Sequence, residues 1–135
     1  MPTLTITPDS AFAILLKARE FDVKVAESDP DSGSNPSDDA EVDALEFTPD
    51  DETLRELLSA IRDLNDDEMI DLVALILVGR EDYTIEEWPA ARQAAAEIGR
   101  TKVPRFIKDI PLVSDFLEEG LSQFGFTLQD YLDAH

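Results

Sequence analysis

Hydrophobic residues recur at helical spacing along most of the chain. The first such segment carries two apolar stripes, which predicts a helix that packs on two sides. The first stripe is Ala11, Ile14, Leu15, Ala18, Phe21 and Val25, and the second is Phe12, Leu16 and Val23. The segment 66–78 is apolar nearly all round apart from Asp71, which predicts a central helix. No window alternates hydrophobic and polar residues convincingly, so no strand is expected. Helices are predicted over residues 8–25, 51–64, 66–78, 84–98 and 111–124, with a last short turn of helix over 127–132.

Capping residues mark where several of these helices begin. A side-chain acceptor followed three residues later by Glu is the pattern of a capping box, in which two otherwise unpaired backbone N–H groups are satisfied. Such a box predicts that the second and third helices form a helical hairpin. The boxes are Asn65 with Glu68 and Thr84 with Glu87, and Thr7 can cap the first helix ahead of Pro8.

Glycines predict helix ends and one close helix contact. Gly79 and Gly99 are expected to stop the helices that precede them. Gly120 lies in an apolar helix face, where the missing Cβ would let a neighbouring helix approach closely. A short turn is expected around 104–109. The pattern therefore predicts an all-α, single-domain bundle over 1–135, with five or six helices and a long loop at 27–50 between the first two.

The charge is concentrated in that loop. The chain has 135 residues with 31 acidic and 11 basic side chains, a formal charge of -20. Residues 27–52 hold 11 acids and no base, so the other 109 residues carry 20 acids and all 11 bases. This balance disfavours direct binding to nucleic acid, because such binding requires a surplus of Lys and Arg. The absence of cysteine excludes disulfides, thiolate metal sites and cysteine nucleophiles.

Four runs of sequence resemble a bacterial family of domains of unknown function, numbered 3775. The acidic run DPDSGSNPSDD at 29–39, which we call the acidic string, is the most specific of the four, because its composition is unusual. The resemblance implies that the acidic string belongs to the domain, and it supplies no catalytic residue because the family has no assigned activity. Relatives often have Gly where this chain has Glu81. The runs are KAREFDVK at 17–24, DPDSGSNPSDD at 29–39, LVALILVGREDY at 72–83 and PLVSDFLEEGL at 111–121.

The acidic string admits three interpretations. An EF-hand is excluded, because Ser34 stands where Gly is needed and Ala40 stands at the final ligand position. A solvated loop that caps its own turns is favoured, while a looser cation site and a docking surface for a basic partner both stay open. The candidate binding residues in the string are Asp29, Asp31, Asp38 and Asp39.

Arg19 and Asp22 form a second candidate site. They lie within the apolar arc of the first helix, where a charge is costly unless it is paired. An ion pair, or an anchor that ties the acidic loop to its helix, is the favoured interpretation. A pocket for an anionic or polar ligand is the alternative.

Clustered acids at the start of the segment 66–78 could instead form part of a metal site. Helical hydrolases use such carboxylates, but the acids must converge from two or more helices, and no matching pair is present. Acids in a first helical turn more often complement the helix dipole. The acids are Asp66, Asp67, Glu68 and Asp71.

The functional expectation is a non-catalytic interaction or regulatory module that docks a basic protein. The alternative is a divalent-metal-dependent helical hydrolase that uses clustered carboxylates. We predict no cofactor, no metal ligand and no catalytic residue, and the single histidine, His135, is the last residue and a poor base. The longest apolar run, 72–78, is far shorter than the roughly 20 residues that span a bilayer. A cytoplasmic protein, monomeric or homodimeric, is expected.

Overall fold

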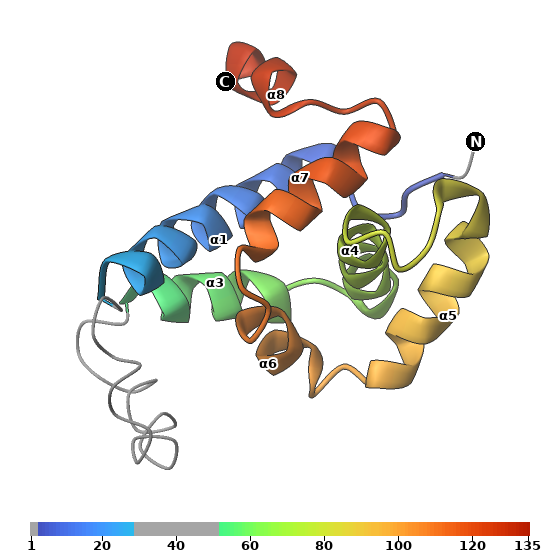
Figure 1. The fold of residues 1–135 in the computed structure, drawn as a ribbon, viewed down its shortest axis with the longest axis horizontal. Helices are drawn as coiled ribbons and strands as arrows, with labels where there is room; N and C mark the ends of the chain where they lie inside the picture. Colours follow the sequence, from blue (N-terminus) through green and yellow to red (C-terminus); the bar gives the residue numbers. More distant parts are fainter. Residues whose placement is uncertain (1–2, 29–51) are drawn as a thin grey trace.

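Helices make up the architecture of this chain (Figure 1). The computed structural model describes residues 3–28 and 52–135, and these ranges contain no strand, so the predicted all-α class is confirmed. The expected loop lies outside the described ranges apart from its first two residues, which end the first helix. In chain order the elements are α1 (Pro8–Ser28), α3 (Glu52–Arg62), α4 (Asp66–Gly79), the 3-10 helix η3 (Ile85–Glu87), α5 (Trp88–Ile98), α6 (Val103–Lys108), α7 (Val113–Gln123) and α8 (Leu128–Ala134).

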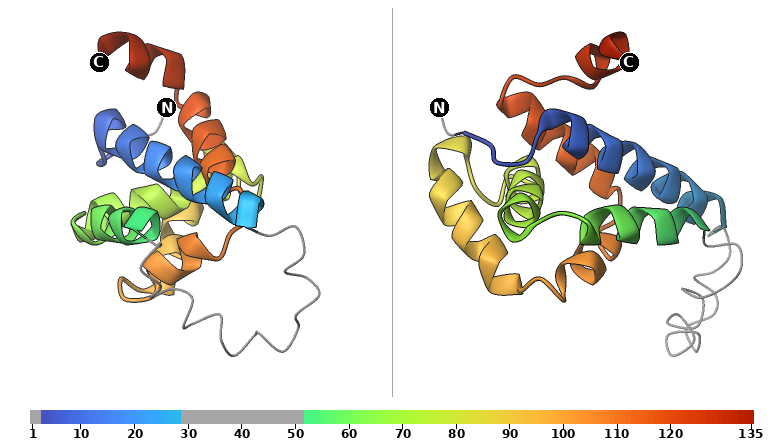
Figure 2. Two further views of the ribbon diagram at one scale, coloured as in Figure 1. Left: turned by 90° about the vertical axis from the view of Figure 1, so that its left-hand side faces the viewer. Right: turned by 180° about the vertical axis from the view of Figure 1, so that it is seen from behind.

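The helix α4 lies at the centre of the molecule. It packs against α7 on one side and α5 on another, and the right-hand view of Figure 2 shows it between α5 and the other long helices. Every residue from Leu72 to Gly79 is buried. Because each fully buried large aliphatic side chain contributes about 1.5–3 kcal/mol, this helix dominates the hydrophobic stabilisation of the fold. The predicted central helix is confirmed.

The helix α1 packs against α3 and α7. Its first apolar stripe is buried as far as Ala18, and from the second stripe Phe12 is buried. Val23, further along the second stripe, is 50% exposed. The expected two-sided packing therefore holds for the first half of α1.

The predicted caps are present. Asn65 Oδ1 accepts from the Glu68 N–H at 2.8 Å, and Glu68 Oε1 accepts from the Asn65 N–H at 2.9 Å, so the box at the start of α4 is complete. Thr7 Oγ1 accepts from the Ser10 N–H at 3.1 Å at the start of α1. The Thr84 N–H donates to Glu87 at 2.9 Å, and this box opens η3, from which α5 continues.

The predicted role of Gly79 as a helix stop is wrong. Gly79 is the last helical residue of α4, and the left-handed residue is Glu81, with φ of 70°. The Glu81 N–H donates to the Val78 carbonyl and the Asp82 N–H to the Leu77 carbonyl, which together form a Schellman motif. The chain therefore turns two residues later than the glycine.

Gly79 and Gly120 instead allow α4 and α7 to cross closely. A Cβ at Gly79 would lie 1.8 Å from the Phe116 carbonyl oxygen, and one at Gly120 would lie 2.1 Å from the Leu75 carbonyl oxygen. Both positions must lack a side chain if the two backbones are to touch. The predicted close approach at Gly120 is confirmed.

Two shorter segments differ in detail from the sequence expectations. The expected turn at 104–109 is the helix α6, with Pro104 in its first turn, where a missing N–H costs nothing. Leu112 takes a left-handed conformation, with φ of 57°, so α7 begins at Val113 and not at Pro111. None of the described helices is both long enough and apolar enough to span a membrane.

Candidate functional site

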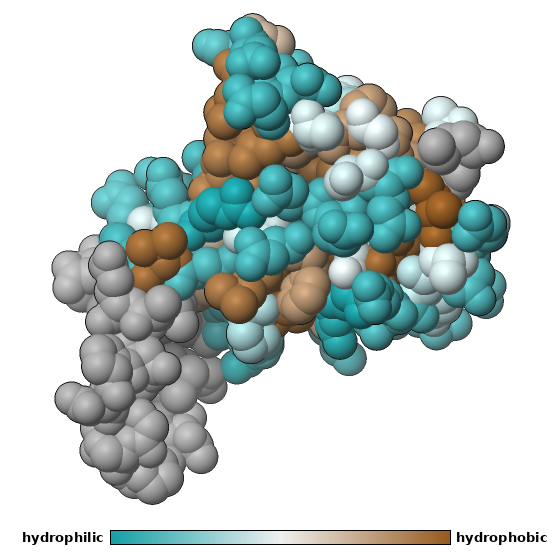
Figure 3. Space-filling model, turned by 45° about the horizontal axis from the view of Figure 1, so that its top comes forward, coloured by the Kyte–Doolittle hydropathy of each residue, from teal (hydrophilic) through white to brown (hydrophobic). Residues whose placement is uncertain are grey.

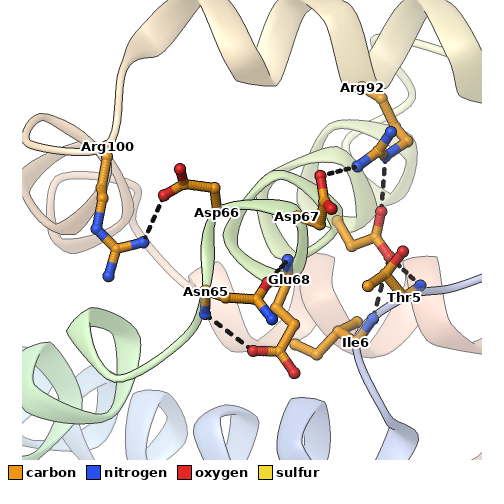
Figure 4. A network of polar contacts seen from close by, with 9 residues as sticks. Thr5, Ile6, Asn65, Asp66, Asp67, Glu68, Arg92 and Arg100 are labelled. Atoms are coloured by element: carbon orange, nitrogen blue, oxygen red, sulfur yellow. Dashed lines mark hydrogen bonds and ion pairs between the residues drawn. The ribbon is translucent and has the colours of Figure 1, made fainter.

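Asp71 is a fully buried carboxylate in the central helix, and it joins three parts of the chain (Figure 4). One carboxylate oxygen accepts from the backbone N–H groups of Thr5 and Ile6, the latter at 3.1 Å. The other oxygen accepts from Arg92 Nε of α5 at 2.8 Å. Asp71 therefore holds the N-terminal segment and α5 against α4, with both of its oxygens occupied.

The acids at the start of α4 have separate partners. Asp66 Oδ1 lies 2.9 Å from Arg100 Nη1, and Asp67 Oδ1 lies 3.6 Å from Arg92 Nη2. Glu68 is engaged in its capping box, as described above. Figure 4 shows these side chains pointing in different directions around the helix. Among residues 3–28 and 52–135, no group of three or more His, Asp or Glu side chains is placed to hold a metal ion.

Arg19 joins α1 to α7. Its Nη2 donates to Asp115 Oδ1 at 3.1 Å and to Glu118 Oε1 at 2.8 Å. Burial disfavours the charged guanidinium, but the hydrogen bonds and charges of Glu118 and Asp115 outweigh burial and raise the pKa of Arg19 above its ordinary value. A raised pKa keeps this contribution to stability fully present below the pKa of the unfolded chain, which lies far above neutral pH. Arg19 therefore stays charged throughout the neutral range.

Asp22 caps the start of α7 from a different helix. Its Oδ2 accepts from the Ser114 hydroxyl at 2.7 Å and from the Ser114 N–H at 3.1 Å. This replaces a local N-cap, because the residue before α7 is Leu112, which has no side-chain acceptor. The described partners of Arg19 and Asp22 thus lie on α7, so the two charged groups anchor helix to helix. The other four candidates, at 29–39, lie outside the described residues.

Sequence reasoning missed Arg92 and Ser114. Asp71 was visible as the single charge in an apolar segment, and a buried acid of this kind requires a base. Its base lies 21 residues further along the chain, and the sequence does not single out Arg92 from the other arginines. Ser114 is 92 residues from Asp22, so no local spacing connects the two.

Several hollows open on the described surface. One, of about 550 Å³, lies along α3 and is lined by Glu52, Glu56 and Asp63 together with Lys17 and Arg55. Three others are smaller. One, of about 230 Å³, lies between α4 and α5 over Met69 and Ala95. A second, of about 500 Å³, lies between α5 and the N-terminal segment beside Arg92. The third, which we call the N-terminal hollow, has about 340 Å³ and is lined by residues 3–8 with Phe124 and Phe126. None of the three contains a pair of converging carboxylates.

A family model matches residues 54–126, which is more than half of the chain. The chain belongs to DUF3775, described as a protein of unknown function. The DUF3775 match extends from α3 past the end of α7, so it includes Asp71, Arg92 and the Gly79–Gly120 crossing. It does not extend over the acidic string, whose place in the DUF3775 domain stays a prediction. No curated protein and no solved structure matches the chain.

Proposed function

We propose that this DUF3775 protein is a non-catalytic interaction or regulatory module that docks a basic protein. The observation that carries the proposal is the surplus of carboxylates, because the chain has 31 acidic and 11 basic side chains. Eleven of the acids lie in residues 27–52, which contain no base. Such a surface attracts a cationic partner at long range and raises the rate of encounter.

Four of the eleven basic side chains pair with carboxylates of another helix, which supports this proposal. Arg19, Arg92 and Arg100 each bind carboxylates of a different helix, at distances of 2.8–3.6 Å. Lys17 of α1 lies 3.9 Å from Glu56 of α3. These cations therefore stabilise helix contacts, and the excess negative charge is left to the surface and to the acidic string.

The proposed docking residues are Asp29, Asp31, Asp38 and Asp39. All four belong to the acidic string, which follows directly after α1. Arg19 and Asp22 enter the proposal as supports, because they fix the α1 helix on α7 ahead of the string.

No observation favours the hydrolase alternative. The carboxylates that could have formed its site, those of Asp66, Asp67, Glu68 and Asp71, each bind an arginine or a backbone N–H group of the fold. A metal hydrolase instead directs several carboxylates at one point.

The test is capture of proteins by the immobilised chain at low and moderate salt, with two charge-matched variants. The first variant changes Asp29, Asp31, Asp38 and Asp39 to Asn. The second removes four exposed acids elsewhere in the described part of the chain, with the substitutions Glu20→Gln, Asp63→Asn, Glu97→Gln and Glu119→Gln.

We expect the first variant to lose a specific basic protein, identified by mass spectrometry, while the second variant retains it. Raising the salt should weaken capture by the native chain, because the attraction between exposed charges is screened. Equal capture by the native chain and the first variant would contradict the proposal, and so would equal loss from both variants, since that would indicate unspecific charge attraction.

A further inference from the structure

The N-terminal hollow has an apolar lining, and the neighbouring stretches of sequence contain acidic residues but no Lys or Arg. Its lining includes Phe126, which is 36% exposed, and Phe124 and Ile6, which are 8% and 1% exposed. Figure 3 shows hydrophobic surface gathered beside the hydrophilic α8, at the end of the molecule where α8 projects from the body. An exposed aromatic side chain on the rim of an apolar hollow is typical of a docking site.

The segments that line the hollow and continue from it along the chain carry acidic side chains only, apart from the terminal histidine. Residues 3–16 and 122–135 contain the acids Asp9, Asp130 and Asp133 and no Lys or Arg. The one histidine of the chain, His135, lies 3.8 Å from Asp9. Arg92, on the far side of the N-terminal segment, is bound to Asp67 and Asp71. A ligand that approaches the hollow therefore meets carboxylates and an apolar opening.

The wall of the hollow is held in place by groups already described. The segment 3–8 would be free to move aside if its N–H groups were unpaired, but Asp71 binds those of Thr5 and Ile6. Opposite this segment, Phe124 packs edge-on against Trp88, with ring centroids 4.8 Å apart. The hollow is therefore preformed, which reduces the entropic cost of binding.

We propose that the N-terminal hollow receives an apolar side chain from a basic peptide segment of the partner. The volume of about 340 Å³ lies at the lower end of the roughly 300–1,000 Å³ found for ligand pockets, which suits one or two side chains. The lysines or arginines around that anchor face Asp9, Asp130 and Asp133. This inference rests on the proposed function and adds to it a second contact of the same basic partner, besides the one at Asp29, Asp31, Asp38 and Asp39.

Trp88 gives a direct readout of the hollow, because it is the single tryptophan of the chain and contacts Phe124. The probes are two short peptides without tryptophan and with equal numbers of lysines. One carries a central Leu-Phe pair, and the other has serines in its place. We expect the first to change the emission of Trp88 with saturation and to bind about tenfold more tightly than the second, as burial of one large apolar side chain implies.

Two variants distinguish binding of the peptide in the hollow from binding to exposed apolar surface in general. Phe126→Ser removes the exposed wall, whereas Leu132→Ser removes a similarly exposed apolar side chain, 48% exposed, that does not line the hollow. Circular dichroism checks that both variants keep their helices. We expect Phe126→Ser to abolish the preference for the apolar peptide and Leu132→Ser to preserve it.

Equal affinity for the two peptides, or an unchanged preference in Phe126→Ser, would overturn the inference. Light scattering of the free protein tests whether a second copy of the chain fills the hollow. A dimer that Phe126→Ser converts to a monomer would show this, and it would also overturn the inference. If the serine peptide binds in a salt-dependent manner while the apolar anchor adds nothing, this inference fails and the proposed function stands. If neither peptide binds, this inference fails, and capture by the native chain and its charge-matched variants decides the proposed function separately.

Discussion

Asp71 is the residue on which the N-terminal segment depends. Its carboxylate, 0% exposed, accepts from two backbone N–H groups and from Arg92. Removing one partner of a buried charge pair is more costly than the pair itself is favourable, because the remaining groups lose their solvation without compensation. We therefore expect Asp71→Asn to lower the free energy of unfolding by about 3 kcal/mol. Urea denaturation followed by circular dichroism measures this loss.

Asp67→Asn is the matched control for that substitution. Asp67 also binds Arg92, but at 3.6 Å and with a side chain that is 71% exposed. An exposed ion pair of this kind contributes less than about 1 kcal/mol. Equal losses for the two variants would mean that burial of Asp71 carries no special weight, contrary to the structure.

Glu81 occupies a backbone conformation that glycine adopts more easily. Its φ of 70° is that of the C′ residue of a Schellman motif, where a side chain is strained. Glu81→Gly relieves this strain but makes the unfolded chain more flexible, and the net effect should be a stabilisation of about 0.5–1 kcal/mol. The same urea titration should show a higher midpoint. Glu97→Gly, at an exposed position in the last turn of α5, should instead destabilise by up to about 1 kcal/mol, and a loss from both would contradict the left-handed turn.

At the residue scale, sequence predicted local contacts and missed distant ones. The cap pairs Asn65 with Glu68 and Thr84 with Glu87 are three residues apart, and both form hydrogen bonds. The pair Asp22 and Ser114 depends on how α1 and α7 cross, which no spacing in the sequence encodes. The sequence therefore indicated that Arg19 and Asp22 require partners, but it did not indicate which residues of α7 those partners are.

At the element scale, the crossing of α4 and α7 is the tightest contact described. A Cβ at Gly120 would lie 2.1 Å from the Leu75 carbonyl oxygen, and backbone on both sides cannot yield without moving a helix. We expect Gly120→Ala to lower the free energy of unfolding by about 3 kcal/mol or to prevent folding, as severe overpacking does. Thermal denaturation followed by circular dichroism measures the effect.

Ser122→Ala is the control within the same helix. Ser122 is exposed, and alanine is the better helix former, so this variant should be neutral or slightly more stable. If Gly120→Ala were as stable as Ser122→Ala, the close approach of α4 and α7 would be wrong.

The elements themselves were largely predictable, because their stripes and caps are local. The sequence identified α4 as central because its apolar residues surround it. It misplaced the end of α4, since Gly79 carries both a glycine's helix-stopping preference and a packing role, and packing against Phe116 decides its position. It also treated α6 as a turn, because six residues are too few to show a stripe.

At the scale of the whole molecule, self-repulsion opposes the fold. A charge of -20 on 135 residues is held more closely together in the folded chain than in the unfolded one, which destabilises the compact state. Ion pairs such as Arg19 with Glu118 act in the opposite direction, but most are exposed and individually weak. The balance between the two effects determines how the protein responds to salt.

We expect sodium chloride to stabilise the protein. The screening length falls from about 30 Å at 0.01 M to about 10 Å at 0.1 M, which removes repulsion between distant acids while leaving close, partly buried pairs in place. The midpoint of thermal unfolding should rise by roughly 4 °C, equivalent to roughly 1 kcal/mol for a chain of this length. Sodium sulfate at matched low ionic strength should give the same rise, because screening depends on ionic strength.

The variant with Asn at 29, 31, 38 and 39 tests where the repulsion originates. It removes four of the 31 acids, all from the acidic string, so its midpoint should be higher at low salt and should rise less as salt is added. A midpoint that falls with salt in the native chain would show that ion pairs between helices outweigh repulsion. An equal rise in both proteins would place the repulsion among the helices, and the charge of the acidic string would then not destabilise the fold.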